Sequence, residues 1–333
     1  MKRILCLALA LFLCAQGAFA AELTVGVCIY DNTDAFMSSM RLDLESYAQG
    51  KAKLIVYDSM NDQNLQNDQV DSLLRENVDA LILNPADRMA AGYLIEKAKQ
   101  RGIPVIFINR EPMPEDLLLY EKAYYVGADA SQSGRLSGEI LADYFLSHPE
   151  ADKNGDGTVQ YVLLRGEPGH QDAELRTQYA LKPLQSAGFR VEKLQEDTGM
   201  WQRQLAQDKM GTFLSAWGDR IECVICNNDE MALGAIDALK AAGYFTGSAY
   251  MPVVGVDATA PALEALQQGS LLGTVLNDGK NQAQAALDLA ILLSRGETPT
   301  AQNFGYPITN GHFVWIPYRS VTREILSAQG GGT

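Results

Sequence analysis

The sequence predicts an α/β fold in which two doubly wound parallel-sheet domains are joined by a three-segment hinge. Three observations lead to this prediction. At 333 residues the chain exceeds what one ordinary hydrophobic core holds, so two domains are expected. Short β-branched runs alternate with amphipathic helical patterns, which is typical of a parallel sheet covered by helices on both faces. This alternation stops near residues 127–129 and then starts again, which indicates two similar halves.

The elements follow one another in regular order. In the first half the predicted strands are residues 25–30, 53–58, 80–84, 105–109 and 124–128, and the helices are 37–49, 68–77 and 90–101. After a helix over 131–146, the predicted strands of the second half are 158–165, 190–194, 221–226, 253–256 and 273–276. Its helices are 172–187, 202–217, 229–241, 260–268 and 280–294. The helices have their apolar residues on one face, whereas the strands are short apolar runs.

Three predicted crossings between the halves, near residues 127–129, 277–278 and 316–318, define two lobes. Residues 22–128 and 278–315 then form the N-terminal lobe, and residues 129–277 and 316–326 form the C-terminal lobe. Residues 327–333 end in three glycines, and we expect them to form a disordered tail.

Residues 1–20 have the features of a cleavable secretory signal peptide. Lys2 and Arg3 precede a largely apolar run over residues 4–15, and an Ala-Phe-Ala sequence at 18–20 supplies a small-x-small cleavage site. The apolar run is too short to span a membrane. We therefore expect a protein that is exported and cut after residue 20.

The charge of the chain narrows the range of partners. The formal net charge is −14, and removal of the two basic residues of the signal makes it more negative by two. A strongly acidic surface argues against nucleic acid and anionic membranes as partners. It fits an exported soluble protein, expected to be a monomer, with a neutral or cationic ligand.

Cysteine usage does not indicate a disulfide framework. An odd number of cysteines, Cys28, Cys223 and Cys226, remains after the signal. The last two lie in one predicted strand at odd spacing and so point to opposite faces, which favours core packing over a zinc or redox site. A lipid anchor at Cys14 is the alternative for the signal, but Leu13 before it is the wrong residue for that modification.

Residues 152–160 have the spacing of a calcium-binding loop. Oxygen donors stand at loop positions 1, 3, 5 and 9, a glycine stands at the sharp turn of position 6, and position 7 offers a backbone carbonyl. These residues are Asp152, Asn154, Asp156, Gln160, Gly157 and Thr158. Position 12, where a Glu is usual, is Leu163, so a bound metal would need a carboxylate from elsewhere in the fold. The alternative is an Asn/Asp/Gly turn without a metal.

Short polar side chains occur where predicted strands end. They are Asp34, Asn109, Asp172, Asn228, Asp257 and Asn277. In doubly wound sheets ligands bind at the carboxyl ends of the strands, so this set predicts a ligand site supplied by both halves. Each residue alone has the alternative role of a helix N-cap or turn residue.

Three further side chains fit a ligand with several hydroxyl groups. Arg176 lies four residues after Asp172 and therefore shares its helical face, although an ordinary ion pair is the alternative. Phe36 and Trp201 lie in loops of opposite halves, where two rings would enclose the apolar faces of a pyranose. For Trp201 the alternative is a role as a loop anchor.

At these residues the chain resembles the periplasmic galactose/glucose-binding proteins, over about residues 22–325. The motifs are DAFM at 34–37, NREP at 109–112, AYYVG at 123–127, GEPGH at 166–170, DTGMW at 197–201, NND at 227–229, GVDA at 255–258 and GTVLND at 273–278. The chain departs from the family at Arg110, where Lys is usual, in a longer loop at 241–252, and in residues 303–315, which match poorly.

The resemblance implies a type I periplasmic binding protein that holds D-galactose or D-glucose. It implies polar sugar contacts from Asp34, Asn109, His170, Asp172, Arg176, Asn228, Asp257 and Asn277, with Phe36 and Trp201 stacked on the two faces. It also implies a structural calcium ion at Asp152, Asn154, Asp156, the Thr158 carbonyl and Gln160, with Glu222 supplying the carboxylate that the loop lacks. The implied partners are an ABC importer and a chemoreceptor.

The expected mechanism is hinge closure around the sugar. Three other functions are its rivals. A sugar-responsive repressor would need a DNA-binding helix-turn-helix where this chain has a signal. A secreted glycosidase would use Asp34 and Asp257 as acid and base, but amides and an Arg accompany them and the sequence has no nucleophile, phosphate or dinucleotide motif, so no enzyme is expected. The third rival is a receptor of the same fold for ribose or another pentose, and His170 and Trp201 favour a hexose over it through the resemblance alone.

Overall fold

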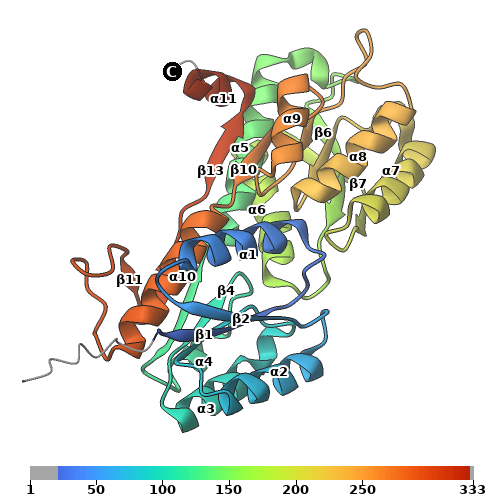
Figure 1. Cartoon of the computed structure of the whole chain (residues 1–333). Helices are drawn as coiled ribbons and strands as arrows, with labels where there is room; N and C mark the ends of the chain where they lie inside the picture. Colours follow the sequence, from blue (N-terminus) through green and yellow to red (C-terminus); the bar gives the residue numbers. More distant parts are fainter. Residues whose placement is uncertain (1–21, 331–333) are drawn as a thin grey trace, which may run out of the picture.

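The computed structural model describes residues 22–330, and their strands form two mostly parallel sheets (Figure 1). The first sheet has the order β11-β12-β5-β4-β3-β1-β2. Its strands are β1 (Thr24–Ile29), β2 (Lys53–Asp58), β3 (Ala80–Leu83), β4 (Val105–Ile108), β5 (Ala123–Gly127), β11 (Ile308–Thr309) and β12 (Phe313–Trp315). We call this sheet with its helices the N-terminal lobe. The signal peptide predicted over residues 1–20 lies outside the described residues.

The second sheet has the order β13-β10-β9-β8-β6-β7 and belongs to the C-terminal lobe. Its strands are β6 (Thr158–Arg165), β7 (Arg190–Thr198), β8 (Cys223–Cys226), β9 (Val253–Val254), β10 (Gly273–Leu276) and β13 (Arg319–Thr322). Only β13 runs antiparallel to its neighbour. The predicted fold class, two doubly wound α/β domains, is therefore confirmed.

Helices cover both faces of the N-terminal sheet. One core contains α1 (Ala35–Ala48) and α10 (Gly279–Ser294), and the opposite core contains α2 (Gln63–Arg75) and α3 (Ala91–Arg101). The short η1 (Arg88–Ala90) and α4 (Pro114–Leu117) lie in the connections on either side of β4. Strands buried on both faces are apolar throughout, as in β3 and β4, where every residue is buried.

The C-terminal sheet is covered in the same way. Helices α7 (Arg203–Trp217), α8 (Asp229–Ala241) and α9 (Ala260–Gln268) share one core, and α5 (Ala130–Ser147) and α6 (Gln171–Ser186) pack on the other face. Short η2 (Pro149–Ala151) and η3 (Gly218–Arg220) precede β6 and β8. Cys223 and Cys226 point into opposite cores, as predicted, and Cys28 is also buried and unpaired.

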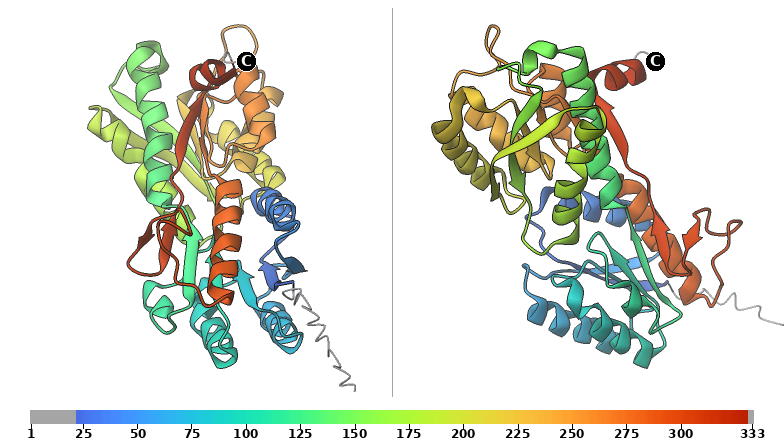
Figure 2. Two further views of the ribbon diagram at one scale, coloured as in Figure 1. Left: turned by 60° about the vertical axis from the view of Figure 1, so that its left-hand side comes forward. Right: turned by 180° about the vertical axis from the view of Figure 1, so that it is seen from behind.

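The chain crosses between the sheets three times, and the crossings are visible between the two halves of the molecule in Figure 2. They run from β5 to α5, from β10 to α10 and from β12 to β13. The first and third are joined where Ile316 N donates to the Gly127 carbonyl at 2.7 Å. The Arg319–Asp278 ion pair, at 3.0 Å, joins the second and third. The residue boundaries given above for the two lobes stay predictions.

Two predictions about the elements need correction. Residues 327–330 were expected to belong to a disordered tail, but they continue the helix α11 (Arg323–Gly330), in which Ser327 Oγ donates to the Arg323 carbonyl. Helix α2 begins five residues earlier than expected because the Asp62 carboxylate caps it, accepting from the N–H groups of Asn64 and Leu65. At α2 the capping hydrogen bonds outweigh the weak apolar pattern of residues 63–67. No helix within residues 22–330 has the length and apolar content needed to cross a membrane.

Candidate functional site between the lobes

One cavity of about 30 Å³ between the lobes is lined by all ten of the predicted ligand residues. The N-terminal lobe contributes Asp34, Phe36 and Asn109; the C-terminal lobe contributes His170, Asp172, Arg176, Trp201, Asn228 and Asp257; and Asn277 stands on the second crossing. Tyr30, which was not predicted, is the eleventh lining residue. The carboxyl ends of both sheets therefore face each other around a single polar cavity with aromatic side chains in its wall.

Asp34 serves both the fold and the cavity. As the N-cap of α1, its Oδ1 accepts from the N–H of Met37 at 2.8 Å, and its Oδ2 accepts from the hydroxyl of Tyr30 at 2.8 Å. The N-cap role foreseen as the alternative is real, yet the same carboxylate still lines the cavity. Phe36 follows in the first turn of α1, and Gly279 at the start of α10 leaves room for its ring.

The Asp172–Arg176 pair is a buried ion pair at the wall of the cavity. Arg176 Nη2 donates to Asp172 Oδ2 at 3.1 Å and to the Tyr318 hydroxyl at 3.0 Å, while Nη1 donates to the Asn227 carbonyl at 2.8 Å. Both side chains are at most a tenth exposed. These contacts fix the guanidinium in place before any ligand binds, which lowers the cost of ordering it.

His170 is the N-cap of α6, and its Nδ1 accepts from the N–H of Asp172 at 3.1 Å. This contact requires Nδ1 without a proton, so the neutral imidazole carries its N–H on Nε2, where it can donate. Burial, followed by the positive charges of Arg110 and Arg176, holds the pKa of His170 well below its usual value. The ring is therefore a neutral hydrogen-bond donor at physiological pH.

Three lining residues have positive φ angles, which non-glycine residues rarely adopt. They are Asn109 at 59°, Trp201 at 65° and Asp257 at 120°. Such strain is concentrated at functional sites and persists only where the surrounding structure enforces it. For Asn109 the enforcing contacts are Tyr125, whose hydroxyl donates to the Asn109 carbonyl, and Asn84, whose amide donates to the side-chain oxygen.

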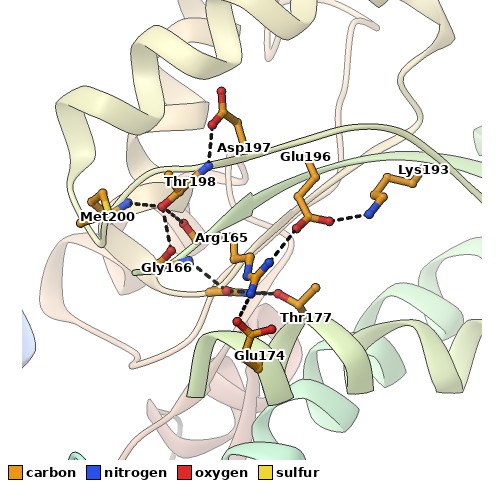
Figure 3. Close-up of polar contacts among 10 residues, drawn as sticks. Arg165, Gly166, Glu174, Thr177, Lys193, Glu196, Asp197, Thr198 and Met200 are labelled. Atoms are coloured by element: carbon orange, nitrogen blue, oxygen red, sulfur yellow. Dashed lines mark hydrogen bonds and ion pairs between the residues drawn. The ribbon is translucent and has the colours of Figure 1, made fainter. Parts of the chain in front are cut away.

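Trp201 lies in the loop after β7, and the hydrogen bonds that Thr198 and Met200 make at the start of this loop are drawn in Figure 3. Thr198 Oγ1 donates to the Gly166 carbonyl at 2.7 Å and accepts from the N–H of Met200, so the loop after β7 is tied to the loop after β6. Only a glycine fits at 166, because a Cβ there would lie 2.1 Å from the Trp201 ring. The edge of the His170 ring contacts the same indole, with centroids 5.1 Å apart.

The remaining lining amides and Asp257 form a chain of side-chain contacts. Asn277 Nδ2 donates to Asp257 Oδ1 at 3.3 Å, and Gln282 Nε2 donates to Asn277 Oδ1 at 2.6 Å. Asn228 caps α8 by accepting from the N–H of Met231, and its Nδ2 donates to the Trp201 carbonyl. The helix caps are thus tied into the cavity wall.

Sequence reasoning missed the residues that orient this set. Tyr30 is the last residue of an apolar run, and its spacing of four from Asp34 was the only signal. Tyr318 lies in the third crossing, where no periodicity marks it. Asp229 is buried beneath Asp257 and accepts from Thr274 Oγ1 at 2.7 Å and from the Thr259 N–H at 2.8 Å. It was expected only to begin a helix.

The two buried carboxylates facing the cavity resist ionisation. Burial raises the pKa of Asp172, against the lowering effect of Arg176, and burial raises the pKa of Asp257 well above its usual value. In this closed arrangement the ionised carboxylates lack the hydration that they would have between open lobes. Closed lobes therefore favour a ligand whose hydroxyl groups donate to these oxygens.

The structure brings Glu222 to the predicted calcium loop. Glu222 Oε1 accepts from the Lys153 N–H at 2.6 Å and Oε2 from the Gln160 N–H at 3.0 Å, because β8 is the neighbour of β6. Gln160 Oε1 is buried and has no hydrogen-bond partner. A set of carboxylate, amide and carbonyl oxygens suits a hard cation such as calcium.

Other features of the loop fit a metal less closely. Asp152 accepts from the N–H groups of Gly155, Asp156 and Gly157, as in an ordinary Asx-rich turn. Within residues 22–330 no three His, Cys, Asp or Glu side chains converge in a way that could hold a metal ion. Half of the six predicted ligand residues, Asn154, Thr158 and Gln160, offer an amide or backbone carbonyl oxygen instead of a carboxylate.

The fold and the cavity define a protein of the periplasmic binding class. A family model described as "Periplasmic binding protein domain" matches residues 25–298, and the chain belongs to this family. The relatives named below are described as binding proteins, so the prediction that the chain is not an enzyme is confirmed.

Relatives cover nearly the whole chain. The D-galactose/methyl-galactoside binding periplasmic protein MglB of Haemophilus influenzae is 44% identical over 315 residues, which are 94% of this chain and 93% of MglB. A putative rhizopine-binding protein of Rhizobium meliloti is 33% identical over 98% of both chains. A solved solute-binding protein of Bacillus halodurans with bound myo-inositol has a TM-score of 0.78 at 28% identity, covering 93% of this chain and 98% of its own.

Proposed function

We propose that this periplasmic binding protein captures a hexose, D-galactose or D-glucose, by closing its lobes, and delivers it to an ABC importer. The observation that carries the proposal is the single cavity lined by polar and aromatic side chains from both lobes. The name of the Haemophilus relative supports galactose as the ligand. Other relatives differ, because one is named for rhizopine and another contains bound myo-inositol.

The residues have distinct roles in this proposal. The carboxylates of Asp34, Asp172 and Asp257 accept from sugar hydroxyl groups, and charge-assisted bonds of this kind are stronger than bonds between neutral groups. Arg176, Asn109 and the Nε2–H of His170 donate. The remaining amides, Asn228 and Asn277, complete the polar rim, while Phe36 and Trp201 pack on the apolar faces of the ring, which aromatic side chains cover well.

Closure follows from the preference of the ligand for one state. A sugar that bridges both lobes binds the closed form more tightly than the open form, and it shifts the equilibrium by that difference alone. Without sugar, closure would bury Asp172 and Asp257 without enough hydrogen-bond donors. The sugar thus replaces the water that these carboxylates lose.

A calorimetric screen of monosaccharides on refolded, sugar-free protein tests this function. We expect saturable one-to-one binding of D-galactose or D-glucose, and weaker binding of ribose and xylose. Chromatography of the sugar after incubation with the protein should recover it unchanged, because no turnover is expected. Tight binding of a pentose alone, or turnover of a glycoside, would replace the proposal with one of its rivals.

We further propose that calcium binds the loop over residues 152–160 together with Glu222 and stabilises the C-terminal lobe. The unpaired Gln160 Oε1 and the placement of Glu222 support this site. When bound, the ion would neutralise carboxylates and link two strands, without a part in sugar binding. The signal over residues 1–20 supports export, and a chemoreceptor partner is proposed on the resemblance alone.

A further inference from the structure

Beside the lined cavity, side chains of the two lobes contact each other directly. Arg110 Nη2 donates to Glu167 Oε2 at 2.6 Å, and Gln171 Nε2 donates to Glu111 Oε2 at 2.6 Å. Arg110 and Glu111 follow β4 of the N-terminal lobe, whereas Glu167 and Gln171 follow β6 of the C-terminal lobe. Both contacts must break when the lobes separate.

These residues lie outside the proposed sugar cavity. They line a second cavity of about 290 Å³, which shares His170 alone with the first. The proposed sugar contacts do not include Arg110 or Glu167. Any effect of this pair on binding would therefore act through the equilibrium between open and closed lobes.

Arg110 is held in position by its own lobe. Its Nη1 donates to the Ala86 carbonyl, and its guanidinium lies 4.0 Å above the ring of Tyr30. The Arg110 side chain is 7% exposed, and that of Glu167 is 25% exposed. A guanidinium fixed in this way meets the carboxylate of the opposite lobe with little additional loss of side-chain entropy.

We propose that Arg110 and Glu167 form an inter-lobe latch, which stabilises the closed lobes without touching the sugar and so tightens binding and slows release. The latch rests on the function proposed above. If the closed state becomes less populated by some factor, the apparent affinity for a ligand of the closed state falls by the same factor. The Arg110–Glu167 pair would thus tune affinity.

The substitution that tests the latch most cleanly is Glu167→Gln, because Glu167 has no other role in the site. We expect the Kd for hexose to rise by about three- to thirtyfold, mainly through faster dissociation, as for loss of a partly buried charged hydrogen bond. Glu174→Gln is the matched control. It removes a carboxylate that pairs with Arg165 inside the C-terminal lobe, as drawn in Figure 3, and should leave the Kd within about twofold.

A double-mutant cycle separates the latch from indirect effects of Arg110, which contacts Tyr30 and lowers the pKa of His170. In an Arg110→Met background, Glu167→Gln should have no further effect on the Kd, because its partner is gone. An unchanged Kd for Glu167→Gln alone, or an undiminished effect in the Arg110→Met background, would overturn the latch.

Failure of the proposed function looks different, since the wild-type protein would then bind no hexose. The latch is then tested on sugar-free protein that carries spin labels at Met89→Cys and Gln204→Cys. Both positions are exposed and lie in different lobes, so the distance between the labels reports whether the lobes are open or closed. Within the described residues 22–330 the native cysteines, Cys28, Cys223 and Cys226, are buried and would not compete for the label. Glu167→Gln should reduce the population with the shorter distance, and identical distributions would refute the latch.

Discussion

Asp34, His170 and Asn228 each cap a helix and line the cavity at the same time. A cap uses one acceptor of the side chain and leaves the other polar atom for a second contact, as with the Tyr30 hydroxyl at Asp34 and the Trp201 carbonyl at Asn228. Because a cap is fixed to the first turn of its helix, this second polar atom is held at a defined place beside the cavity. At the scale of single residues, the same hydrogen bonds thus build the fold and orient the proposed ligand contacts.

Gly166→Ala should weaken hexose binding although it removes no polar group. The new methyl would overlap the Trp201 ring and displace it from the cavity wall. We expect the Kd to rise by about tenfold or more, since stacking on an aromatic ring contributes on the order of 1 kcal/mol or more. Calorimetry measures the change. Gly211→Ala is the control, because a Cβ at Gly211 meets nothing within 4 Å, and equal affinity of both variants would contradict this account of Trp201.

His170 should make the stability of the protein depend on pH. Its ordinary pKa is 6.5, and the folded protein holds it well below that value, so the unfolded chain binds more protons between the two values. The stabilisation is complete above about pH 6.5 and is lost as pH falls toward the folded pKa. His170→Asn keeps a capping acceptor but cannot titrate.

The melting temperature, measured at about pH 7.5 and about pH 5.5, should therefore fall less for His170→Asn than for the wild-type protein. His148→Asn serves as the comparison, because His148 is exposed and its substitution leaves the buried imidazole in place. Equal decreases for His170→Asn and the wild type would show that His170 does not set this pH dependence.

At the scale of helices and loops, the same kind of cap appears with and without a binding role. Asp62 caps α2 far from the cavity lining, and Asn228 caps α8 within it. Asp62→Ala and Asn228→Ala should each lower the free energy of unfolding by about 1 kcal/mol, as measured by urea denaturation. Only Asn228→Ala should also weaken hexose binding in calorimetry. Similar losses of affinity in both variants would argue that Asn228 acts through the helix alone.

The loop proposed to bind calcium belongs to the same scale, because it precedes β6 and contacts Glu222, which precedes β8. Chelation with EDTA should lower the melting temperature by roughly 5 °C or more, and added calcium should restore it, since a ligand of the folded state stabilises that state. Glu222→Gln should lose this response. If chelation leaves the melting temperature of the wild-type protein unchanged, the loop is a turn without a metal.

At the scale of the whole molecule, alternating strands and helices were enough to predict two doubly wound sheets. Because ligands bind at the carboxyl ends of the strands in such sheets, the sequence alone also predicts that Asp34, Asn109 and Asp257 share one site. The role of His170 in the site was predicted from the family resemblance and not from the periodicity of the sequence.

Other features depend on tertiary contacts that no local pattern records. Tyr318 enters from the third crossing, more than a hundred residues after its partner Arg176, and the Arg110–Glu167 pair exists only when the lobes meet. The helix over 323–330 has too short an apolar pattern to stand out from a tail. Side-chain contacts between residues far apart in the sequence, and short helices with few apolar residues, could therefore not be predicted from the sequence.

Small-angle scattering of the sugar-free protein, recorded with and without saturating D-galactose or D-glucose, tests the central claim that a hexose closes the two lobes. We expect the radius of gyration to decrease when the hexose is added and to stay unchanged with Trp201→Ala, which should no longer bind at the same concentration. An identical radius of gyration for the wild-type protein with and without a hexose that calorimetry shows to be bound would contradict closure around the sugar.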